Sequence, residues 1–517
     1  MSASREKKQR QTSNVRNAKK LTAAQKAAAA KRKTTQYTLI GVVVAVLVAA
    51  LLFWDAGFIQ RNTTALTIGS VEYSPADVNY YYNSIYQNTY LYAYYGLNSY
   101  DVSKAPDEQI YSTDDKTGEK TTWHEYFLDS AIDTLVSITA SYEAALKAGY
   151  TVADVADDVK TEMTSLSESA SKGGYSSVKQ MLVSYYGKTM TKAAYEELIT
   201  RYALASLYLE KYHDDLDITE EALNNYYKAN AKDLDTFDYT YLYFKAATVS
   251  EKDADGNKLS DDAIKAAKKE AMEKAKAQAN EVLEHLKNGD DVNEVIKNHG
   301  PSSSSVNNVA VGSSITSSIA EWLTKEGRTK GDMDVVEYTD YGYYVVIMND
   351  RYVDETPSAD VRHILISAEI SEGAKTPTNA QMLAAKAKAE ALLEEWKKGE
   401  ATAESFAELA EKNSTDTGSN KNGGLYEQVF EGDFVTNFNE WMFGETKREV
   451  GETGIVENNG TNYYGYHIIY FEGYNEGDFA WKNTADEALR SEAVTAHQEE
   501  LEKPLTITEG TGMKYVG

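Results

Sequence analysis

The chain after residue 235 repeats one pattern twice, and this duplication restricts the folds it can adopt. The last strand-like segments of the two copies align residue by residue, with Gly342-Tyr343-Tyr344 against Gly465-Tyr466-His467. The repeating segments are a strand, a charged helical pattern and a closing strand, at 237–244, 260–287 and 341–350 and again at 361–366, 379–399 and 464–471. A period of about 120 residues is too long for a solenoid. We therefore predict an α+β chain with tandem domains at 235–353 and 358–475.

The N-terminal residues have the pattern of a membrane anchor. Residues 37–54 are uncharged and mostly apolar, and as a helix they would span about 27 Å, enough for a hydrocarbon core. The preceding residues 1–35 hold eleven Lys or Arg and one acidic residue. By the positive-inside rule this tail is cytoplasmic. We predict a single-pass anchor at 36–54 in the plasma membrane with the bulk of the chain extracytoplasmic; a cleaved signal peptide is the alternative.

Charge and composition exclude several kinds of partner. The net charge is −27, which argues against nucleic acid, and the absence of cysteine excludes disulfides and thiolate metal sites. The seven histidines do not occur at metal-ligand spacing. Residues 253–262 resemble a calcium loop but have lysine at the sixth position, where glycine is expected. We expect no metal and no cofactor.

Residues 55–234 are dominated by helical patterns. Ser74 and Thr219 are typical N-cap residues. Residues 80–96 hold eight tyrosines, which suit either an aromatic core face or reversible contact with unfolded peptide. The tail, 476–517, contains one amphipathic helix that is too short to fold alone. We expect it to pack on another part of the chain.

Two histidines interrupt apolar strands of the second copy. Period-two alternation places His363 on one face of its strand and His467 on one face of the closing strand. If these strands are neighbours, the two imidazoles meet. A loop between them carries Asp416 and a sharp bend at Gly423-Gly424. A lone histidine in a strand is commonly a core residue, but this combination favours a site.

Phe434 and Phe438 follow that loop. Their spacing of four residues predicts one aromatic face of a helix, next to the histidines.

At these residues the sequence resembles the parvulin-type peptidyl-prolyl isomerases. The blocks that carry the resemblance are "VRHILI", "STDTGSNKNGG", "GDFVTNF" and "GYHII" within residues 358–475. The resemblance implies a small antiparallel sheet wrapped by helices. It makes His363, Asp416 and His467 the catalytic residues. It also places Tyr426, Phe434 and Phe438 in the proline pocket, with Tyr426 in place of the usual leucine and Phe434 in place of methionine.

The whole layout is similar to extracytoplasmic foldases of the PrsA and SurA type. This implies a helical chaperone domain made of 55–234 and completed by 476–517, with unfolded or newly secreted proteins containing X-Pro bonds as clients. The first copy has Tyr241 and Tyr344 at the histidine positions, so we expect it to be a degenerate domain, a spacer or a peptide-binding platform. A non-catalytic holdase and an envelope scaffold with one dedicated partner remain alternatives, and a homodimer is left open.

Overall fold

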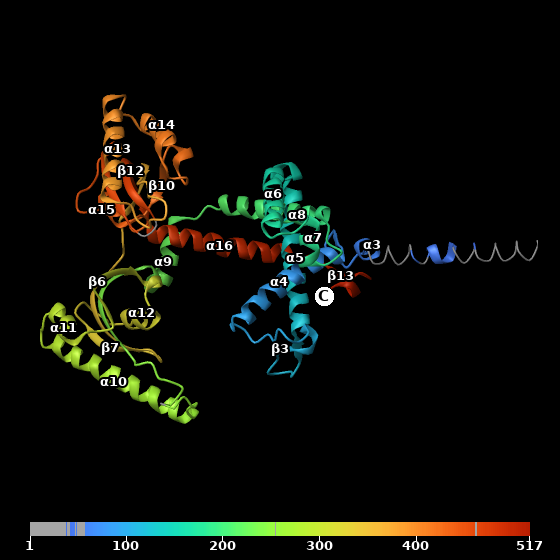
Figure 1. Ribbon diagram of the computed structural model, residues 1–517, viewed down its shortest axis with the longest axis horizontal. Coiled ribbons are helices and arrows are strands. Elements are labelled where there is room, and N and C mark those ends of the chain that lie inside the picture. The colour runs from blue at the N-terminus through green and yellow to red at the C-terminus, as the bar shows by residue number, and fades with distance from the viewer. Residues whose placement is uncertain (1–37, 39–41, 47, 49–56, 254, 461–462) are drawn as a thin grey trace, which may run out of the picture. The chain divides into compact units, whose positions relative to one another are not determined.

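The computed structural model describes most of the chain after residue 56 (Figure 1). The described residues are 38, 42–46, 48, 57–253, 255–460 and 463–517. None of the helices formed by these residues is long and apolar enough to cross a membrane. Most of the predicted anchor at 36–54 lies outside the described residues.

The described residues divide into two compact units, those up to residue 216 together with 491–517, and those from 217 to 490. The sequence predicted boundaries at 234 and 476 instead. The difference arises because the helix α9 (Glu220–Leu234) packs on the start of the last helix, α16 (Ala480–Glu502), through a small apolar cluster. Lys482 also bonds Glu220 at 2.9 Å.

The first unit is helical, with a small sheet. Its main helices are α4 (Pro75–Tyr94), α5 (Trp123–Ala148), α6 (Ala156–Lys172), α7 (Val178–Tyr186) and α8 (Lys192–Asp214). Ser74 precedes α4 as its N-cap, and Gly149 ends α5 in the left-handed conformation. Phe127 and Leu135 of α5 are fully buried.

The C-terminal residues complete this first unit. The strand β13 (Ile507–Glu509) pairs with β1 (Leu66–Ile68), which pairs in turn with β2 (Val71–Tyr73). His497, near the end of α16, stacks on Tyr212 of α8 with ring centroids 3.9 Å apart. The tail thus folds as part of a unit whose other residues lie more than 270 positions earlier in the sequence.

The second unit contains two four-stranded antiparallel sheets of the same design. The first has the order β6-β5-β8-β7 and the second β10-β9-β12-β11. The strands of the first are β5 (Thr236–Lys245), β6 (Ser303–Val311), β7 (Met333–Tyr338) and β8 (Gly342–Tyr352). Those of the second are β9 (Pro357–Ser367), β10 (Leu425–Val429), β11 (Thr453–Asn459) and β12 (Tyr464–Phe479). In each sheet the first and last strands of the copy are the central pair, as the site prediction requires.

Helices cover both faces of each sheet in the same way. The first copy has α10 (Asp261–Lys287) and α11 (Val292–His299) on one face and α12 (Ser317–Leu323) on the other. The second has α13 (Asn379–Lys398) and α14 (Ala403–Asn413) on one face and α15 (Thr436–Phe443) on the other. The predicted duplication is therefore present in the sheet order and in the helix layers.

Candidate active site

The two histidines of the second copy lie side by side at the centre of its sheet. His363 on β9 and His467 on β12 share the face covered by α15, and their strands are adjacent and antiparallel. Their Nδ1 atoms are 2.9 Å apart and their rings stack with centroids at 5.1 Å. Only 3% of His363 and 1% of His467 is exposed. The predicted meeting of the imidazoles is confirmed.

Asp416 reaches the same cluster from the loop between α14 and β10. Its Oδ2 accepts a hydrogen bond from Nε2 of His363 at 2.9 Å and one from the Tyr426 hydroxyl at 3.1 Å. The Ser419 hydroxyl and the Gly418 amide also donate to this carboxylate. The bond from His363 is the main reason that the pKa of Asp416 lies well below its usual range. Asp416 is therefore an anion that orients a neighbouring imidazole.

The Gly423-Gly424 bend fixes this loop against β9. Both glycines have positive φ, and the Gly424 carbonyl accepts the amide hydrogen of His363 at 2.8 Å. A Cβ on Gly424 would lie 2.2 Å from the His363 carbonyl oxygen. Only glycine allows this close approach of the loop to the strand.

The cluster is one continuous chain of hydrogen-bonded groups. Burial and the neighbouring His363 lower the pKa of His467 to about 3, so His467 is neutral at neutral pH. Because the anionic Asp416 only accepts, Nε2 of His363 carries a hydrogen. Nδ1 of His363 and Nδ1 of His467 share the next hydrogen bond, and Nε2 of His467 bonds the Tyr463 hydroxyl at 3.3 Å. A continuous line of hydrogen bonds thus runs from Tyr463 through both histidines to Asp416.

Three aromatic side chains, Phe438, Phe434 and Tyr426, lie beside the histidines and form an aromatic wall. Phe438 is fully buried on α15 and meets His467 edge to face, with centroids 5.1 Å apart. Phe434 stacks on Phe438 at 4.5 Å and meets Tyr426 edge to face at 5.2 Å. Phe434 and Tyr426 are partly exposed, so the wall is open to solvent on their side.

The prediction that Phe434 and Phe438 share one helical face is wrong. Phe434 lies just before Val435, the N-cap of α15, and is outside the helix. The two rings still stack because the turn entering α15 folds Phe434 back over the first helical turn.

Sequence reasoning missed Tyr463 and Ser419. Ser419 lies three residues after Asp416, a spacing at which a hydroxyl commonly bonds a loop carboxylate. Tyr463 precedes β12 and reaches His467 four positions later, on the same strand end. Because Tyr464 and Tyr466 lie next to it, the sequence alone does not distinguish Tyr463 as a residue of the site.

The first copy holds tyrosines at the corresponding positions. Strand register pairs His363 with Ile469 in the second copy and Tyr241 with Val346 in the first. The rings of Tyr241 and Tyr344 are 5.8 Å apart, matching the histidine pair in position. Only residues 300–302 separate α11 from β6, so the loop that carries Asp416 in the second copy has no counterpart.

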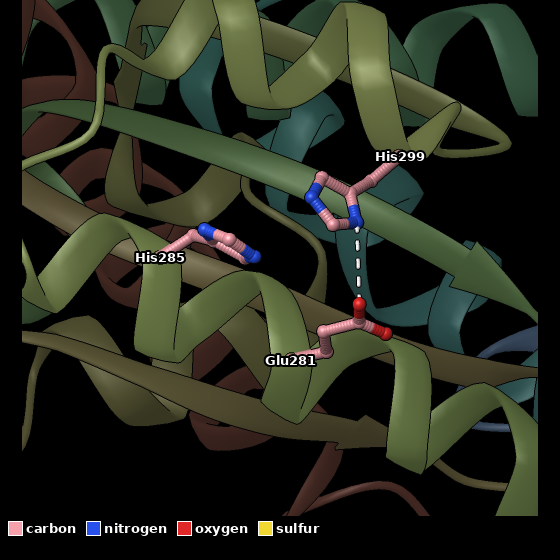
Figure 2. Close-up of side chains that lie close together, drawn as sticks. All are labelled: Glu281, His285 and His299. Atoms are coloured by element: carbon pink, nitrogen blue, oxygen red, sulfur yellow. Dashed lines mark ion pairs between the residues drawn. The ribbon is translucent and has the colours of Figure 1, made fainter.

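The histidines show no metal-ligand spacing in the sequence, but the fold brings two of them together with a carboxylate. Figure 2 shows Glu281, His285 and His299 around one common space on the first copy. The spacing in sequence hid this cluster because the turn between α10 and α11 brings His299 back beside α10. In the segment with the calcium-loop pattern, the Asp253 carboxylate accepts hydrogen bonds from the backbone and side-chain amides of Asn257, and α10 begins at Asp261.

The low pKa of His467 makes the stability of the second copy depend on pH. The unfolded chain binds a proton on this histidine near pH 6.5, whereas the folded chain does so only near pH 3. The stabilisation is therefore complete above about pH 6.5 and is lost as the pH falls toward 3. We expect the second copy to lose about 2 kcal/mol between about pH 7 and pH 5. Hydrogen exchange of the β9 and β12 amides, corrected for intrinsic rates, measures this loss. A His467→Gln variant should show a flatter dependence; an identical slope would contradict the assignment.

A comparison with protein-family models finds a match over the second copy. Residues 348–474 match the family model described as the PPIC-type PPIASE domain. Among solved structures, the peptidylprolyl isomerase PrsA from Bacillus anthracis is 20% identical, and the match covers 29% of this chain and 58% of that one, with a TM-score of 0.19. The foldase protein PrsA from Streptococcus pneumoniae is 14% identical, with 75% and 87% covered and a TM-score of 0.25.

A third similar structure is a chain from the work on the SurA-like chaperones PEB4 and Cj1289 of Campylobacter jejuni. It is 13% identical, and the match covers 76% of this chain and 96% of that one, with a TM-score of 0.13. No curated protein matches the chain significantly.

Proposed function

We propose that this chain, a parvulin-type peptidyl-prolyl isomerase by virtue of its PPIC-type domain at residues 348–474, is a membrane-anchored foldase that acts outside the cytoplasm. Its clients are unfolded or newly secreted proteins that contain X-Pro bonds. The observation that carries the catalytic part of this proposal is the line of hydrogen bonds from His467 through His363 to Asp416, set beside an aromatic wall.

The isomerisation reaction requires no covalent chemistry from the site. Isomerisation of an X-Pro bond breaks no bond; the barrier of about 18–20 kcal/mol is the loss of amide resonance on twisting. A dry site that favours the twisted amide over the planar one lowers this barrier. Two buried, hydrogen-bonded imidazoles and one oriented carboxylate provide fixed dipoles that need no rearrangement during the twist.

The aromatic wall suits the proline ring. Phe434 and Tyr426 have partly exposed rings, and the fully buried Phe438 packs against Phe434. We assign substrate binding to these three residues, and catalysis to His363, Asp416 and His467. The Tyr426 hydroxyl already donates to Asp416, so Tyr426 links the apolar wall to the polar cluster.

The helical unit supports a chaperone role for the same chain. The first half of the tyrosine-rich helix α4 faces the core, where Tyr82 is buried, whereas its end is exposed. There, Tyr92, Tyr94 and Tyr95 are 49%, 72% and 67% exposed. A cavity of about 460 Å³ lies between α4, α6 and α8 and is lined by rings such as Tyr80 and Tyr195. Such surfaces suit weak contact with unfolded peptide.

Removing the exposed tyrosines should reduce holdase activity selectively. For a Tyr92→Ser, Tyr94→Ser, Tyr95→Ser triple variant we expect several-fold weaker suppression of client aggregation, with isomerase activity on a short peptide unchanged. Light scattering of a denatured client measures the effect. Val152→Ser, which removes another exposed apolar side chain of this unit, is the matched control and should behave as the parent. Equal suppression by the triple variant and the parent would contradict the assignment.

The membrane anchor and the location rest on the sequence pattern of residues 1–54, with its basic tail and apolar run. Cell fractionation, with protease added from outside, tests both. Degradation of the C-terminal domain by external protease, with the N-terminal tail protected, is the expected result.

Refolding of a client limited by proline isomerisation tests the proposed function. We expect the full chain to accelerate the slow phase at substoichiometric concentration. A non-catalytic holdase, the alternative, would prevent aggregation and leave that rate unchanged or slower. An envelope scaffold would instead co-purify with one partner in fixed ratio.

A further inference from the structure

Two helices of the first copy bring three metal-ligating side chains together at its surface. Glu281 and His285 lie one helical turn apart on α10, and His299 is the last residue of α11. One ligand atom from each lies within 4.8 Å of the others. Figure 2 shows both imidazoles and the carboxylate bordering the same space. This cluster belongs to the copy that lacks the histidine pair, so the isomerase site does not account for it.

The separations are close to those of a metal site. Nδ1 of His299 is 3.9 Å from Oε1 of Glu281, too long for a hydrogen bond. A tetrahedral Zn²⁺ ion with bonds of about 2.1 Å holds its ligand atoms about 3.4 Å apart. The imidazole centroids are 4.8 Å apart and inclined by 50°. Glu281 is 65% exposed along its side chain, so a rotamer change can close the remaining gap.

A carboxylate orients one of the three ligands by bonding the ring nitrogen that would not contact the metal. Asp290 Oδ2 accepts from Nδ1 of His285 at 2.7 Å, which leaves Nε2 as the free lone pair. A carboxylate on the far nitrogen is the arrangement that holds a zinc-ligating imidazole in its tautomer and raises its basicity. Asp290 is placed by the tight turn at Gly289, whose φ is +90°.

The scaffold under the cluster is rigid. Leu286 of α10 and Val295 of α11 are buried in one apolar cluster against the sheet, so the two helices are fixed relative to each other. The equivalent helix of the second copy has the same core spacing but other surface residues. Ala279, Val282, Leu283 and Leu286 of α10 match Ala389, Leu392, Leu393 and Trp396 of α13 at a constant offset. On this alignment Ala391 and Glu395 replace Glu281 and His285, so the ligands are a property of the first copy alone.

We propose that Glu281, His285 and His299 form a Zn²⁺ site, with Asp290 as a positioning residue and water completing the coordination. Two imidazoles and a carboxylate are ligands that Zn²⁺ accepts readily. The ion would tie the end of α11 to α10 and so stabilise the first copy, giving this domain a structural role distinct from isomerisation.

Zn²⁺ titration of the full chain tests the proposal, with excess Mg²⁺ present to occupy weak carboxylate sites. Calorimetry should show one Zn²⁺ per chain, and Co²⁺ should give the visible absorption of a tetrahedral site. We expect His285→Ala and His299→Ala each to weaken binding by well over tenfold, and Asp290→Asn by about tenfold. His213→Ala, a histidine beside Asp214 in the other unit, is the control and should bind as the parent.

Thermal melting provides a second readout, since bound Zn²⁺ should raise the Tm of the parent and not that of His285→Ala. All substituted side chains are at least partly exposed, and circular dichroism checks that the variants fold. The proposal is overturned if the parent binds no Zn²⁺ under these conditions, or if the ligand variants bind it as tightly as the His213→Ala control.

Discussion

Replacing His363 with alanine is expected to lower kcat/KM for X-Pro isomerisation by roughly two orders of magnitude, the order of loss found when one preorganised polar group is removed from an active site. His363 is the central link of the cluster, because it contacts both Asp416 and His467. Its removal leaves a buried imidazole nitrogen and a carboxylate without their partner and admits water beside Phe438. A coupled peptide assay with the full chain measures the change.

In the same assay, the Asp416→Asn variant distinguishes the effect of the Asp416 charge on the orientation of His363 from the effect of Asp416 side-chain packing. The amide has nearly the same volume, but it lacks the charge that fixes the His363 tautomer. We expect a loss of roughly tenfold, smaller than for His363→Ala, because a hydrogen bond to a neutral group is about 1 kcal/mol weaker than one to a charged group. The matched control is Tyr241→Ala, the equivalent strand position of the first copy, which should keep the parent rate. Equal losses in the control and in His363→Ala would mean that the effect is not specific to the second copy.

Gly424→Ala is expected to destabilise the second copy by about 3 kcal/mol, from about 1–2 kcal/mol for a left-handed backbone with a Cβ and a similar amount for the steric clash. The added Cβ would lie 2.2 Å from the His363 carbonyl oxygen. Relief of this clash pulls the loop off β9 and breaks the hydrogen bond from the His363 amide to Gly424. Because Asp416 lies on the same loop, isomerase activity should fall with stability.

Gly373→Ala is the control that measures the cost of a Cβ on a left-handed backbone without a steric clash. Gly373 also has a positive φ, +80°, but an added Cβ would meet no atom within 4 Å. It should cost only about 1 kcal/mol and leave activity unchanged. Urea unfolding and the peptide assay on both variants test the prediction, which fails if the two glycines respond alike.

The central part of the site could be predicted because it depends on local periodicity. Alternation in β9 and β12 fixes the faces of His363 and His467, and the duplication indicates which strands form the central pair. The Gly423-Gly424 bend could also be predicted, since glycine adopts the left-handed conformation without the energetic penalty of a Cβ.

Other features of the site depend on tertiary contacts, which cannot be read from a short stretch of the sequence. Phe434 lies outside α15 although its spacing to Phe438 suggested a helix, because the entry turn rather than the helix brings the rings together. Tyr463 joins the site only through the approach of the strand end to His467. The cluster of Glu281, His285 and His299 needed the geometry of the α10–α11 turn.

The most direct test of the account is the exchange of a short X-Pro peptide between its cis and trans forms, measured by NMR exchange spectroscopy with a small amount of the full chain. A catalyst at the His363 cluster speeds both directions equally and leaves the cis/trans ratio unchanged. We predict faster exchange at that unchanged ratio, abolished by His363→Ala. An exchange rate equal to that of the free peptide, or a ratio that shifts with bound protein while the rate does not rise, would contradict it.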